Sequence, residues 1–410
     1  MHDAPFPARG RYADGFEPLA RTFASHLSRG EEVGAALTVF HRGACVIDVW
    51  GGLADVASQR PWERDTRIVV FSVTKGLAAM AFLLLAERGA FDWDAPVSAY
   101  WPGFARGGKE DVSVRTLLNH RAGLCALDRP LTMADCVRED AADRLRDAIE
   151  AQRPKWEPGA SQGYHAITFG MYARELFERV AGEPMGAFLQ RELFDPLGSD
   201  VRLGTPPELD AKIATLVTPS IGERLSGTLG AALRRPDCTE ARVLRAALAR
   251  RSLVRGAFGN PKLDPRGLRA YNEPPIRRAQ LAWASATATA RGLARAYLPF
   301  SSGGRYEGRT FVREDRLSPI YERQSWSERD RVLQKPLGWS QGFLKEEAGV
   351  FGPTREAFGH AGMGGALGWC DPVHGLALGY VMNRMDWRVR SPRALALCRA
   401  LYECEPLRGR

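Results

Sequence analysis

A serine and a lysine lie one helical turn apart where an apolar segment of this chain leads into an apolar helix. The segment Arg67–Phe71 has the character of a short strand, and Ser72 and Lys75 follow it closely. Residues 76–86 read GLAAMAFLLLA, an apolar run that predicts a buried helix. Because side chains three residues apart share one helix face, we expect Ser72 and Lys75 to meet inside the protein.

The Ser72–Lys75 pair has the chemistry of a nucleophile and its base. A serine hydroxyl attacks a carbonyl carbon only weakly until a base removes its proton. Burial lowers the pKa of a lysine towards neutrality, so Lys75 can accept that proton. The positive end of the helix favours the negative charge that develops on the attacked oxygen. The alternative is a helix start at the surface, with Ser72 as its cap and Lys75 in solvent, which the apolar flanks disfavour.

Strand patterns occur towards both ends of the chain, and helical patterns lie between them. The first helix is expected at Phe16–Leu27 and the last at Arg393–Tyr402. The main expected strands are Gly34–His41, Cys45–Gly51, Gly338–Leu344, Glu356–His360, Ala366–Cys370 and Leu376–Asn383. This pattern predicts an α/β (α+β) fold with one sheet made from both termini. We expect an α/β domain from residues 1–74 and 335–410 and a mainly α-helical domain from residues 75–334, with the active site at their interface.

Two further segments carry groups suited to acyl chemistry. Tyr164 lies in the turn-rich stretch Gly163–Ala166, where a nearby ammonium can favour the phenolate that shuttles a proton. The alternative is a partly buried structural tyrosine. Residues 359–365 read GHAGMGG, and their glycines allow the backbone to approach a ligand and help form an oxyanion hole. The alternative there is a glycine-rich turn.

The segment Gly159–Gly163 matches G-x-S-x-G and makes Ser161 a rival nucleophile. That motif requires a buried strand directly before the serine, and two prolines precede Ser161 instead, so we favour Ser72. Of the histidines outside these motifs, we expect His120 to be structural and His374 to lie at the surface. No cluster of His, Asp and Glu has metal-ligand spacing, so we expect neither a metal nor a cofactor.

Much of the basic charge behind the net charge of +9 lies in the middle of the chain. Residues 222–256 hold eight arginines and three acidic residues. Within them, residues 241–250 have the pattern of an amphipathic helix with an arginine face. We interpret this as a solvated helix, with contact to a membrane surface or an acidic partner as the alternative. No nucleic-acid motif accompanies the charge, so no nucleic-acid partner is expected.

Cysteine usage and the N-terminus bear on the compartment. The seven cysteines include no C-x-x-C pair, which favours reduced thiols over a disulfide framework. The first 20 residues lack the apolar segment of a signal peptide. The apolar run after Lys75 is too short to span a bilayer. These features predict a cytoplasmic protein without a membrane span, and they leave the oligomeric state open.

Seven short motifs, taken in order, resemble those of the serine β-lactamase and penicillin-binding-protein superfamily. They are SVTK (72–75), LLNHRAGL (117–124), WEPG (156–159), GYHA (163–166), PLG (196–198), TARGLARAY (289–297) and GHAG (359–362). The resemblance extends over Val33–Met385 and is strongest to the class C-like esterase branch, the family VIII carboxylesterases. It implies an antiparallel sheet from both termini, flanked by helices, with a mainly α-helical domain inserted.

The resemblance also implies roles for individual residues. Ser72 is then the nucleophile, and Lys75 is the base or proton-relay partner. Tyr164 takes the place of the tyrosine in the family's Y-x-N motif. The backbone N–H groups of Ser72 and of Met363, which follows Gly362 in the glycine-rich turn, are expected to form the oxyanion hole.

Three departures from the family motifs concern the substrate. Ala166 replaces the asparagine of Y-x-N, which binds the acylamide side chain in β-lactam-recognising relatives, and Ala361 replaces the threonine of K-T-G. His360 stands where many relatives have the lysine of K-T-G or the histidine of H-T-G. A histidine can be neutral where a lysine holds a fixed charge for a substrate carboxylate. These changes weaken recognition of a β-lactam or of peptidyl-D-alanine.

We therefore expect a serine carboxylesterase that cleaves short-acyl esters through a Ser72 acyl-enzyme, with a small-molecule ester as its substrate. The alternatives are an acyltransferase or amide hydrolase on the same scaffold, then a β-lactamase or D-alanyl peptidase, and last a non-catalytic binding protein. Phe258 and Tyr271 lie in the long segment between the tyrosine loop and the last strands, and we expect them at the mouth of the acyl pocket.

Overall fold

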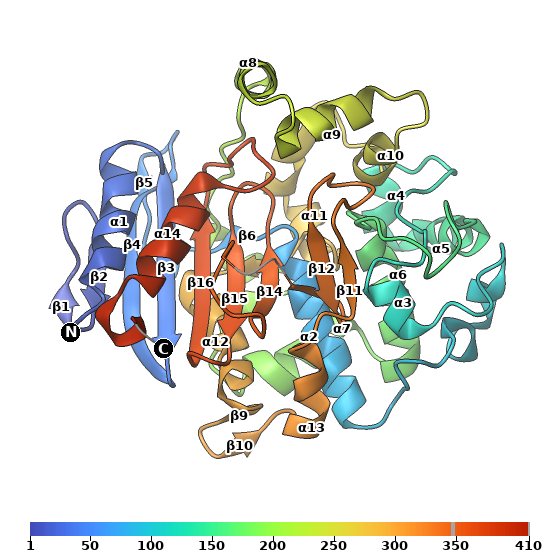
Figure 1. The fold of residues 1–410 in the computed structure, drawn as a ribbon, viewed down its shortest axis with the longest axis horizontal. Helices are drawn as coiled ribbons and strands as arrows, with labels where there is room; N and C mark the ends of the chain where they lie inside the picture. The colour runs from blue at the N-terminus through green and yellow to red at the C-terminus, as the bar shows by residue number, and fades with distance from the viewer. Residues whose placement is uncertain (346–348, 409–410) are drawn as a thin grey trace.

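An antiparallel sheet of eleven strands is the largest element of the computed structural model, which describes residues 1–345 and 349–408 (Figure 1). In spatial order its strands are β1 (His2–Asp3), β2 (Arg9–Tyr12), β4 (Ala44–Asp55), β3 (Gly34–His41), β16 (Leu376–Met382), β15 (Leu367–Asp371), β14 (Phe358–Ala361), β13 (Phe343–Lys345), β12 (Leu337–Ser340) and β11 (Ser325–Ser327). The short strand β5 (Arg60–Pro61) pairs with β4. Residues 346–348 and 409–410, which belong to the predicted segment 335–410, lie outside the described residues.

Strands from the two ends of the chain meet at the β3–β16 pair. The two strands are antiparallel, in a register that runs from Ala35 opposite Met382 to His41 opposite Leu376. All seven residues of β16 and seven of the eight in β3 are buried, so the junction lies in the core. The predicted sheet made from both termini is thereby confirmed. The limits predicted for two domains remain a prediction.

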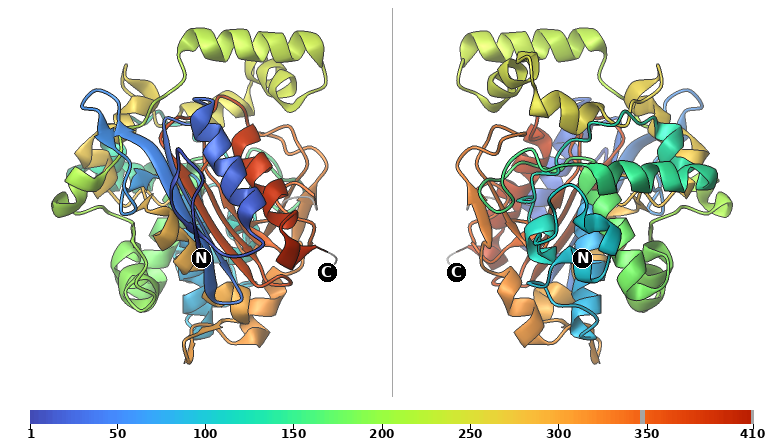
Figure 2. Two further views of the ribbon diagram at one scale, coloured as in Figure 1. Left: turned by 90° about the vertical axis from the view of Figure 1, so that its left-hand side faces the viewer. Right: turned by 90° about the vertical axis from the view of Figure 1, so that its right-hand side faces the viewer.

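Helices cover both faces of the sheet. Helices α1 and α14 pack against each other on one face, and α12 packs on the other face against β3, β15 and β16 (Figure 2). Helix α2 contacts β13, β14 and β15 and also α6 and α7, so it connects the sheet to the helical region. The α-helices of the described residues are α1 (Glu17–Ser28), α2 (Val73–Glu87), α3 (Val114–Leu118), α4 (Met133–Val137), α5 (Ala142–Ala151), α6 (Thr168–Ala181), α7 (Met185–Leu189), α8 (Ile221–Arg234), α9 (Thr239–Leu248), α10 (Leu253–Gly259), α11 (Pro274–Arg278), α12 (Ala290–Tyr297), α13 (Glu314–Leu317) and α14 (Pro392–Tyr402).

Two small sheets complete the fold. One has the order β6 (Ile68–Val69), β8 (Thr287–Ala288) and β7 (Val201–Arg202), and it connects the segment before α2 to the end of the helical region. The other is the hairpin of β9 (Arg305–Tyr306) and β10 (Arg309–Thr310). The first of these sheets matters for the site, because β6 leads directly into the turn that carries Ser72.

Two expected strands differ from the observed ones for a backbone reason. The run Gly338–Leu344 forms two strands, β12 and β13, because Gln341 and Gly342 have φ values of 47° and 85°. Positive φ at both central residues is the conformation of a tight hairpin turn. The strand predicted at Arg67–Phe71 is shorter, since Phe71 has a φ of 47°, outside the β region.

The expectation that His374 lies at the surface is wrong. Its side chain is buried, with Nδ1 2.9 Å from Oδ2 of Asp371. The same carboxylate oxygen accepts a hydrogen bond of 2.7 Å from the hydroxyl of Tyr402 in α14. The turn that carries His374 is therefore folded against the last helix, a long-range contact that its local sequence does not indicate.

The arginine-rich segment forms α8, α9 and α10, which lie together at one edge of the molecule (Figure 1). The amphipathic pattern at residues 241–250 corresponds to α9. Helix α8 stands away from the body of the protein in the side views and packs against α9 (Figure 2). In the part of the chain that the structure describes, no helix combines the length and the apolar composition needed to cross a membrane.

Candidate active site

The chain turns sharply just before Ser72. Phe71 adopts a left-handed backbone conformation, which costs a non-glycine residue of order 1–3 kcal/mol and persists only where the surroundings hold it. The surroundings do so here: the N–H of Val70 donates to the carbonyl of Ala286 at 2.9 Å, and the ring of Phe71 packs on Tyr271 with centroids 5.0 Å apart. Helix α2 then starts with Ser72 at its N-terminus.

Two side chains meet at the hydroxyl of Ser72: that of Lys75, one turn along α2, and that of Tyr164, from a distant loop. Lys75 Nζ lies 3.0 Å from Ser72 Oγ, and the hydroxyl of Tyr164 donates a hydrogen bond of 2.9 Å to the same oxygen. Lys75 Nζ also donates to the backbone carbonyl of Trp283 at 3.0 Å and lies 5.1 Å from the centroid of the Tyr164 ring. The structure thus brings together the three residues that the sequence proposes for catalysis.

Burial shifts the pKa values of Lys75 and Tyr164 in opposite directions. The side chain of Lys75 is fully buried, and burial lowers its pKa well below the usual range of lysine. Burial also raises the pKa of Tyr164, which favours the neutral phenol over the phenolate considered from the sequence. Lys75 is therefore the group suited to take the proton from Ser72, while Tyr164 is suited to donate one.

Two glycines allow the sheet and α2 to approach closely at this point. A Cβ on Gly76 would lie 2.5 Å from the hydroxyl oxygen of Tyr297 and 3.2 Å from Cβ of His360. A Cβ on Gly362 would lie 2.4 Å from the carbonyl oxygen of Val70. Real Cβ contacts are longer than these, so any larger residue would push β14 away from the nucleophile. The glycines therefore fix the distance between Ser72 and the end of β14.

The turn after β14 presents backbone N–H groups next to Ser72. The N–H of Gly362 donates to Ala366 at 2.6 Å, and that of Gly365 donates to Gly362 at 3.2 Å, which closes the turn around Met363. Within residues 1–345 and 349–408, the N–H groups of Ser72 and Met363 donate to no backbone carbonyl. Both groups are thus available to an oxyanion, in keeping with the expected oxyanion hole.

His360 is buried in β14 as a neutral imidazole. Burial lowers its pKa to about 3. Its Nδ1 lies 2.8 Å from the carbonyl oxygen of Ala361, which can only accept, so Nδ1 carries the proton. A neutral ring cannot supply the fixed positive charge that a lysine would offer to a substrate carboxylate.

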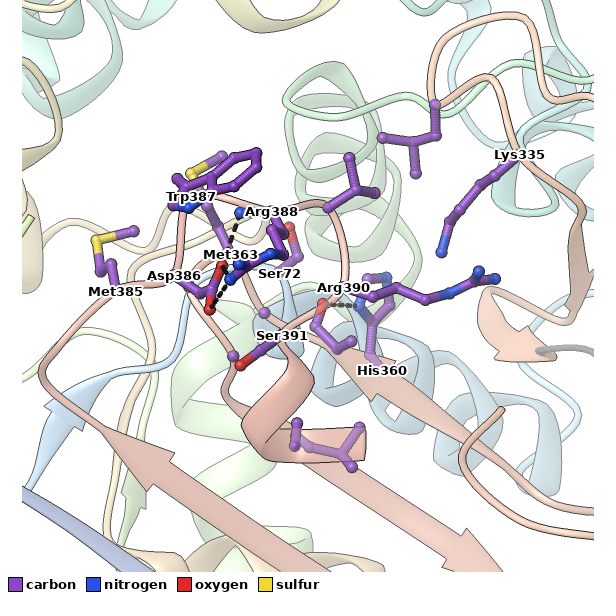
Figure 3. Close-up of a pocket in the computed structure, with 18 of the residues that line it drawn as sticks. Ser72, Lys335, His360, Met363, Met385, Asp386, Trp387, Arg388, Arg390 and Ser391 are labelled. Atoms are coloured by element: carbon purple, nitrogen blue, oxygen red, sulfur yellow. Dashed lines mark hydrogen bonds and ion pairs between the residues drawn. The ribbon is translucent and has the colours of Figure 1, made fainter. Parts of the chain in front are cut away.

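A cavity of about 360 Å³ opens in front of Ser72. In Figure 3, Trp387 and Arg388 lie on one side of Ser72, and Lys335 and His360 lie on the other. Much of the wall is apolar, and it includes Leu337, Trp339, Leu344, Phe351 and Leu367. A space of this size and character suits a small, largely apolar ligand.

The two residues expected at the pocket mouth have different positions. Phe258 lines the cavity, as do Met363 and Gly362 from the glycine-rich turn. Tyr271 does not line it: the residue is buried, its hydroxyl accepts a hydrogen bond of 3.2 Å from Nε1 of Trp283, and its ring packs behind the turn before Ser72. Tyr271 therefore does not have the pocket role expected for it. It supports the segment of Trp283, whose backbone carbonyl binds Lys75.

Asp330 holds the tyrosine loop and was not anticipated from the sequence. Its buried carboxylate accepts backbone N–H bonds from Tyr164 at 3.0 Å, Val332 at 2.9 Å and Leu333 at 2.8 Å. These bonds fix the loop of Tyr164 to the segment that precedes β12. No motif surrounds Asp330, and the contact spans 166 residues, so only the folded structure reveals it.

Ser161, the rival nucleophile, and His120, which was expected to be structural, both lie outside the catalytic group of Ser72, Lys75 and Tyr164. Ser161 follows the turn at residues 158–160, has no strand before it and is not among the residues that line the cavity. His120 is buried against Trp339 and Tyr164, and its Nδ1 accepts the backbone N–H of His165 at 2.9 Å, a structural arrangement. Among the described residues, no group of three His, Cys, Asp or Glu side chains could hold a metal ion.

The site matches the arrangement that the sequence motifs suggest. Ser72 and the buried Lys75 lie at the start of α2, Tyr164 approaches from its loop, and the end of β14 lies beside them. The family model described as Beta-lactamase matches residues 19–400. This chain belongs to the beta-lactamase family. The match includes Ser72, Lys75, Tyr164 and the β14 turn.

Individual relatives cover nearly the whole beta-lactamase-like chain. Esterase/beta-lactamase LipL of Mycobacterium tuberculosis is 33% identical over 392 residues, which are 94% of this chain and 85% of LipL. The crystal structure of a family VIII carboxylesterase is 32% identical, with a TM-score of 0.84 over 97% of this chain and 100% of that one. A penicillin-binding protein homologue from Caulobacter crescentus is 30% identical, with a TM-score of 0.81 over 96% of this chain and 99% of that one. The predicted family and fold are confirmed, and the chain is a β-lactamase-like serine hydrolase.

Proposed function

We propose that the protein hydrolyses short-acyl carboxylic esters through an acyl-enzyme on Ser72. One observation carries the proposal: Ser72 Oγ lies within hydrogen-bond distance of both a fully buried lysine amine and a tyrosine hydroxyl. A nucleophile, a neutral base and a proton donor are the groups that acyl transfer requires.

In the first half of the proposed reaction, Ser72 Oγ attacks the ester carbonyl carbon and its proton passes to the neutral Lys75 amine. The N–H groups of Ser72 and Met363 bind the oxyanion of the tetrahedral intermediate. When the C–O bond to the alcohol breaks, the Tyr164 hydroxyl protonates the leaving oxygen and recovers a proton from the Lys75 ammonium. The products are a free alcohol and the Ser72 ester, and Lys75 is neutral again.

In the second half, water attacks the Ser72 ester with Lys75 as its base. The water proton passes to Lys75, either directly or through Tyr164, and then to Ser72 Oγ as the C–O bond to the enzyme breaks. The carboxylic acid leaves and the starting state returns. The proton transfers use Lys75 Nζ and the Tyr164 hydroxyl, which both lie within 3.0 Å of Ser72 Oγ.

Ester substrates are favoured by the residues around the nucleophile. Ala166 and Ala361 lack the polar groups that relatives use for the acylamide and carboxylate of a β-lactam, and His360 is neutral. Relatives at 32–33% identity are named an esterase and a carboxylesterase. The name of LipL also includes beta-lactamase, so β-lactam cleavage by the same acyl-enzyme is the second candidate.

The test is hydrolysis of p-nitrophenyl butyrate by the protein, by Ser72→Ala and by Ser161→Ala. We expect Ser72→Ala to lose about 10³-fold or more in kcat, as enzymes do when the nucleophile is removed, and Ser161→Ala to keep its activity. Full activity in Ser72→Ala would refute the proposal. Nitrocefin in the same assay measures the β-lactam activity, and a higher kcat/KM for it than for the ester would reverse the order of the two candidates.

A further inference from the structure

Helix α8 presents its large apolar side chains to solvent. Ile221, Leu225, Leu229 and Leu233 recur at every fourth residue, so they form one ridge, and their exposed fractions are 53–84%. A surface helix of a globular protein normally turns such a stripe towards the core. In α8 the side towards the body carries small residues such as Gly227. The apolar face of α8 is thus turned towards solvent, and its face of small residues is turned towards the protein.

The attachment of α8 does not involve this ridge. A Cβ on Gly227 would lie 2.6 Å from the ring of Trp387, so the helix backbone rests directly on that indole. Otherwise α8 packs mainly against α9, and it projects from the body in both side views (Figure 2). Among the described residues, the ridge is thus not part of the hydrophobic core.

Positive charge surrounds the ridge. The exposed arginines of α8, α9 and the adjoining turns are Arg224, Arg234, Arg235, Arg245, Arg250, Arg251 and Arg255. Among the described residues, the ion pair that these arginines make with a carboxylate is that of Arg245 with Asp237, at 3.7 Å. A further exposed apolar side chain, Leu248, lies at the end of α9 next to Arg250 and Arg251. The surface of α8 and α9, here called the α8–α9 surface, is therefore both apolar and cationic.

The α8–α9 surface borders the cavity of Ser72. Arg224 and Thr228 on α8 line that cavity, together with Phe258 of α10 and with Trp387, on which α8 rests. A surface that the ridge of α8 touches would thus lie next to the entrance of the site.

We propose that the α8–α9 surface docks the protein onto lipid bilayers that carry anionic headgroups. Leucines that enter the headgroup region and arginines that bind anionic lipid are the two contributions by which interfacial helices bind membranes. A second copy of this chain is a poorer occupant, because it would bring two sets of seven arginines together. An acidic protein matches the charge, but a single projecting convex helix offers little of the complementary area that a stable protein interface requires.

The experiment is flotation of the full chain with vesicles of equal parts phosphatidylglycerol and phosphatidylcholine, and with vesicles of phosphatidylcholine alone. The test variant is L225S/L229S/L233S. The matched control is F6S/V56S/V373S, which removes three exposed apolar side chains far from α8 in sequence. Far-UV circular dichroism and urea unfolding check that each variant is folded, and none of the six residues lines the cavity.

We expect the protein and the control to float with the anionic vesicles and the test variant to bind at least about tenfold more weakly. Added sodium chloride should weaken binding, because exposed charges are screened. Failure of the protein to float with anionic vesicles, or equal flotation of the test variant, would overturn the proposal. So would a dimer in sedimentation equilibrium that the test variant abolishes, because the ridge would then belong to a protein interface. Binding is measured without turnover, so its failure is distinct from failure of the proposed esterase function.

Discussion

Removal of the Tyr164 hydroxyl is the sharpest single-atom perturbation of the site. In Tyr164→Phe the ring keeps its stacked contact with Trp339, at a centroid distance of 5.6 Å, and its contact with His120. The one hydrogen bond lost is the 2.9 Å bond to Ser72 Oγ. The variant therefore removes the proton donor of the proposed reaction and leaves the nucleophile and the base in place.

The expected loss of activity follows from the role of the hydroxyl. A positioned acid or base contributes about 10²–10⁴-fold to a rate, so kcat should fall by that factor, or by about 2.7–5.4 kcal/mol in activation free energy. The free energy of unfolding should change little, because a single buried hydrogen bond contributes about 1 kcal/mol and Ser72 Oγ keeps Lys75 as a partner. Tyr164→Phe should thus lose most of its activity with only a small loss of stability.

The assay compares kcat for p-nitrophenyl butyrate and the urea unfolding curve of Tyr164→Phe with those of Tyr172→Phe. Tyr172 is also buried, and its hydroxyl donates a bond of 2.9 Å to the carbonyl of Ile149, away from the cavity. Tyr172→Phe should lose about 0.5–1.5 kcal/mol of stability and keep its kcat. A Tyr164→Phe protein with normal unfolding and a kcat within about threefold of the unchanged protein would refute the proton-donor role.

Three further predictions concern the base, the packing and the loop. Lys75 must be neutral to act as a base, and burial holds its pKa well below the usual range of lysine. The value of kcat/KM should therefore fall as the pH drops through that lowered pKa. A rise in kcat/KM only near pH 10.5 would contradict this prediction. Gly76→Ala should lower the free energy of unfolding by about 1–3 kcal/mol, because its Cβ would lie 2.5 Å from the Tyr297 hydroxyl. Gly222→Ala, whose Cβ would have its nearest neighbour at 3.8 Å, should not lower it. Equal urea midpoints for the two variants would refute the close packing at Gly76. Asp330→Ala leaves three backbone N–H groups without their acceptor, so the free energy of unfolding should fall by about 3 kcal/mol or more. The value of kcat should fall with it. An unchanged urea curve would show that Asp330 does not stabilise the loop.

Local sequence patterns predicted much of this structure because they act over short distances. The apolar flanks of Ser72 and Lys75 predicted a buried helix start, and the strand patterns towards both termini predicted their common sheet. The motif order predicted the family, which the match over residues 19–400 confirms. The hairpin between β12 and β13 was missed because its turn, Gln341–Gly342, looks like one more pair of strand residues unless the two positive φ values are known.

Contacts between distant segments explain what the sequence could not predict. The partner of Lys75 is the backbone carbonyl of Trp283, a group that every residue type carries, so no motif marks it. Tyr271 supports the segment of Trp283 instead of lining the pocket, because the direction of its side chain is set by packing against Phe71. The outward face of α8 has the same origin: its pattern shows an apolar stripe, and only the tertiary structure shows that the stripe faces solvent.

In the proposed reaction, Ser72 forms a covalent ester with the acyl group of the substrate, and this step can be observed. It is tested most directly by mixing the protein briefly with p-nitrophenyl butyrate, stopping the reaction with acid and mapping the butyryl group by peptide mass spectrometry. We expect one butyryl group on the peptide that contains Ser72, and none on the same peptide of Ser72→Ala. A butyryl group on Ser161, or turnover by Ser72→Ala at the rate of the unchanged protein, would contradict it.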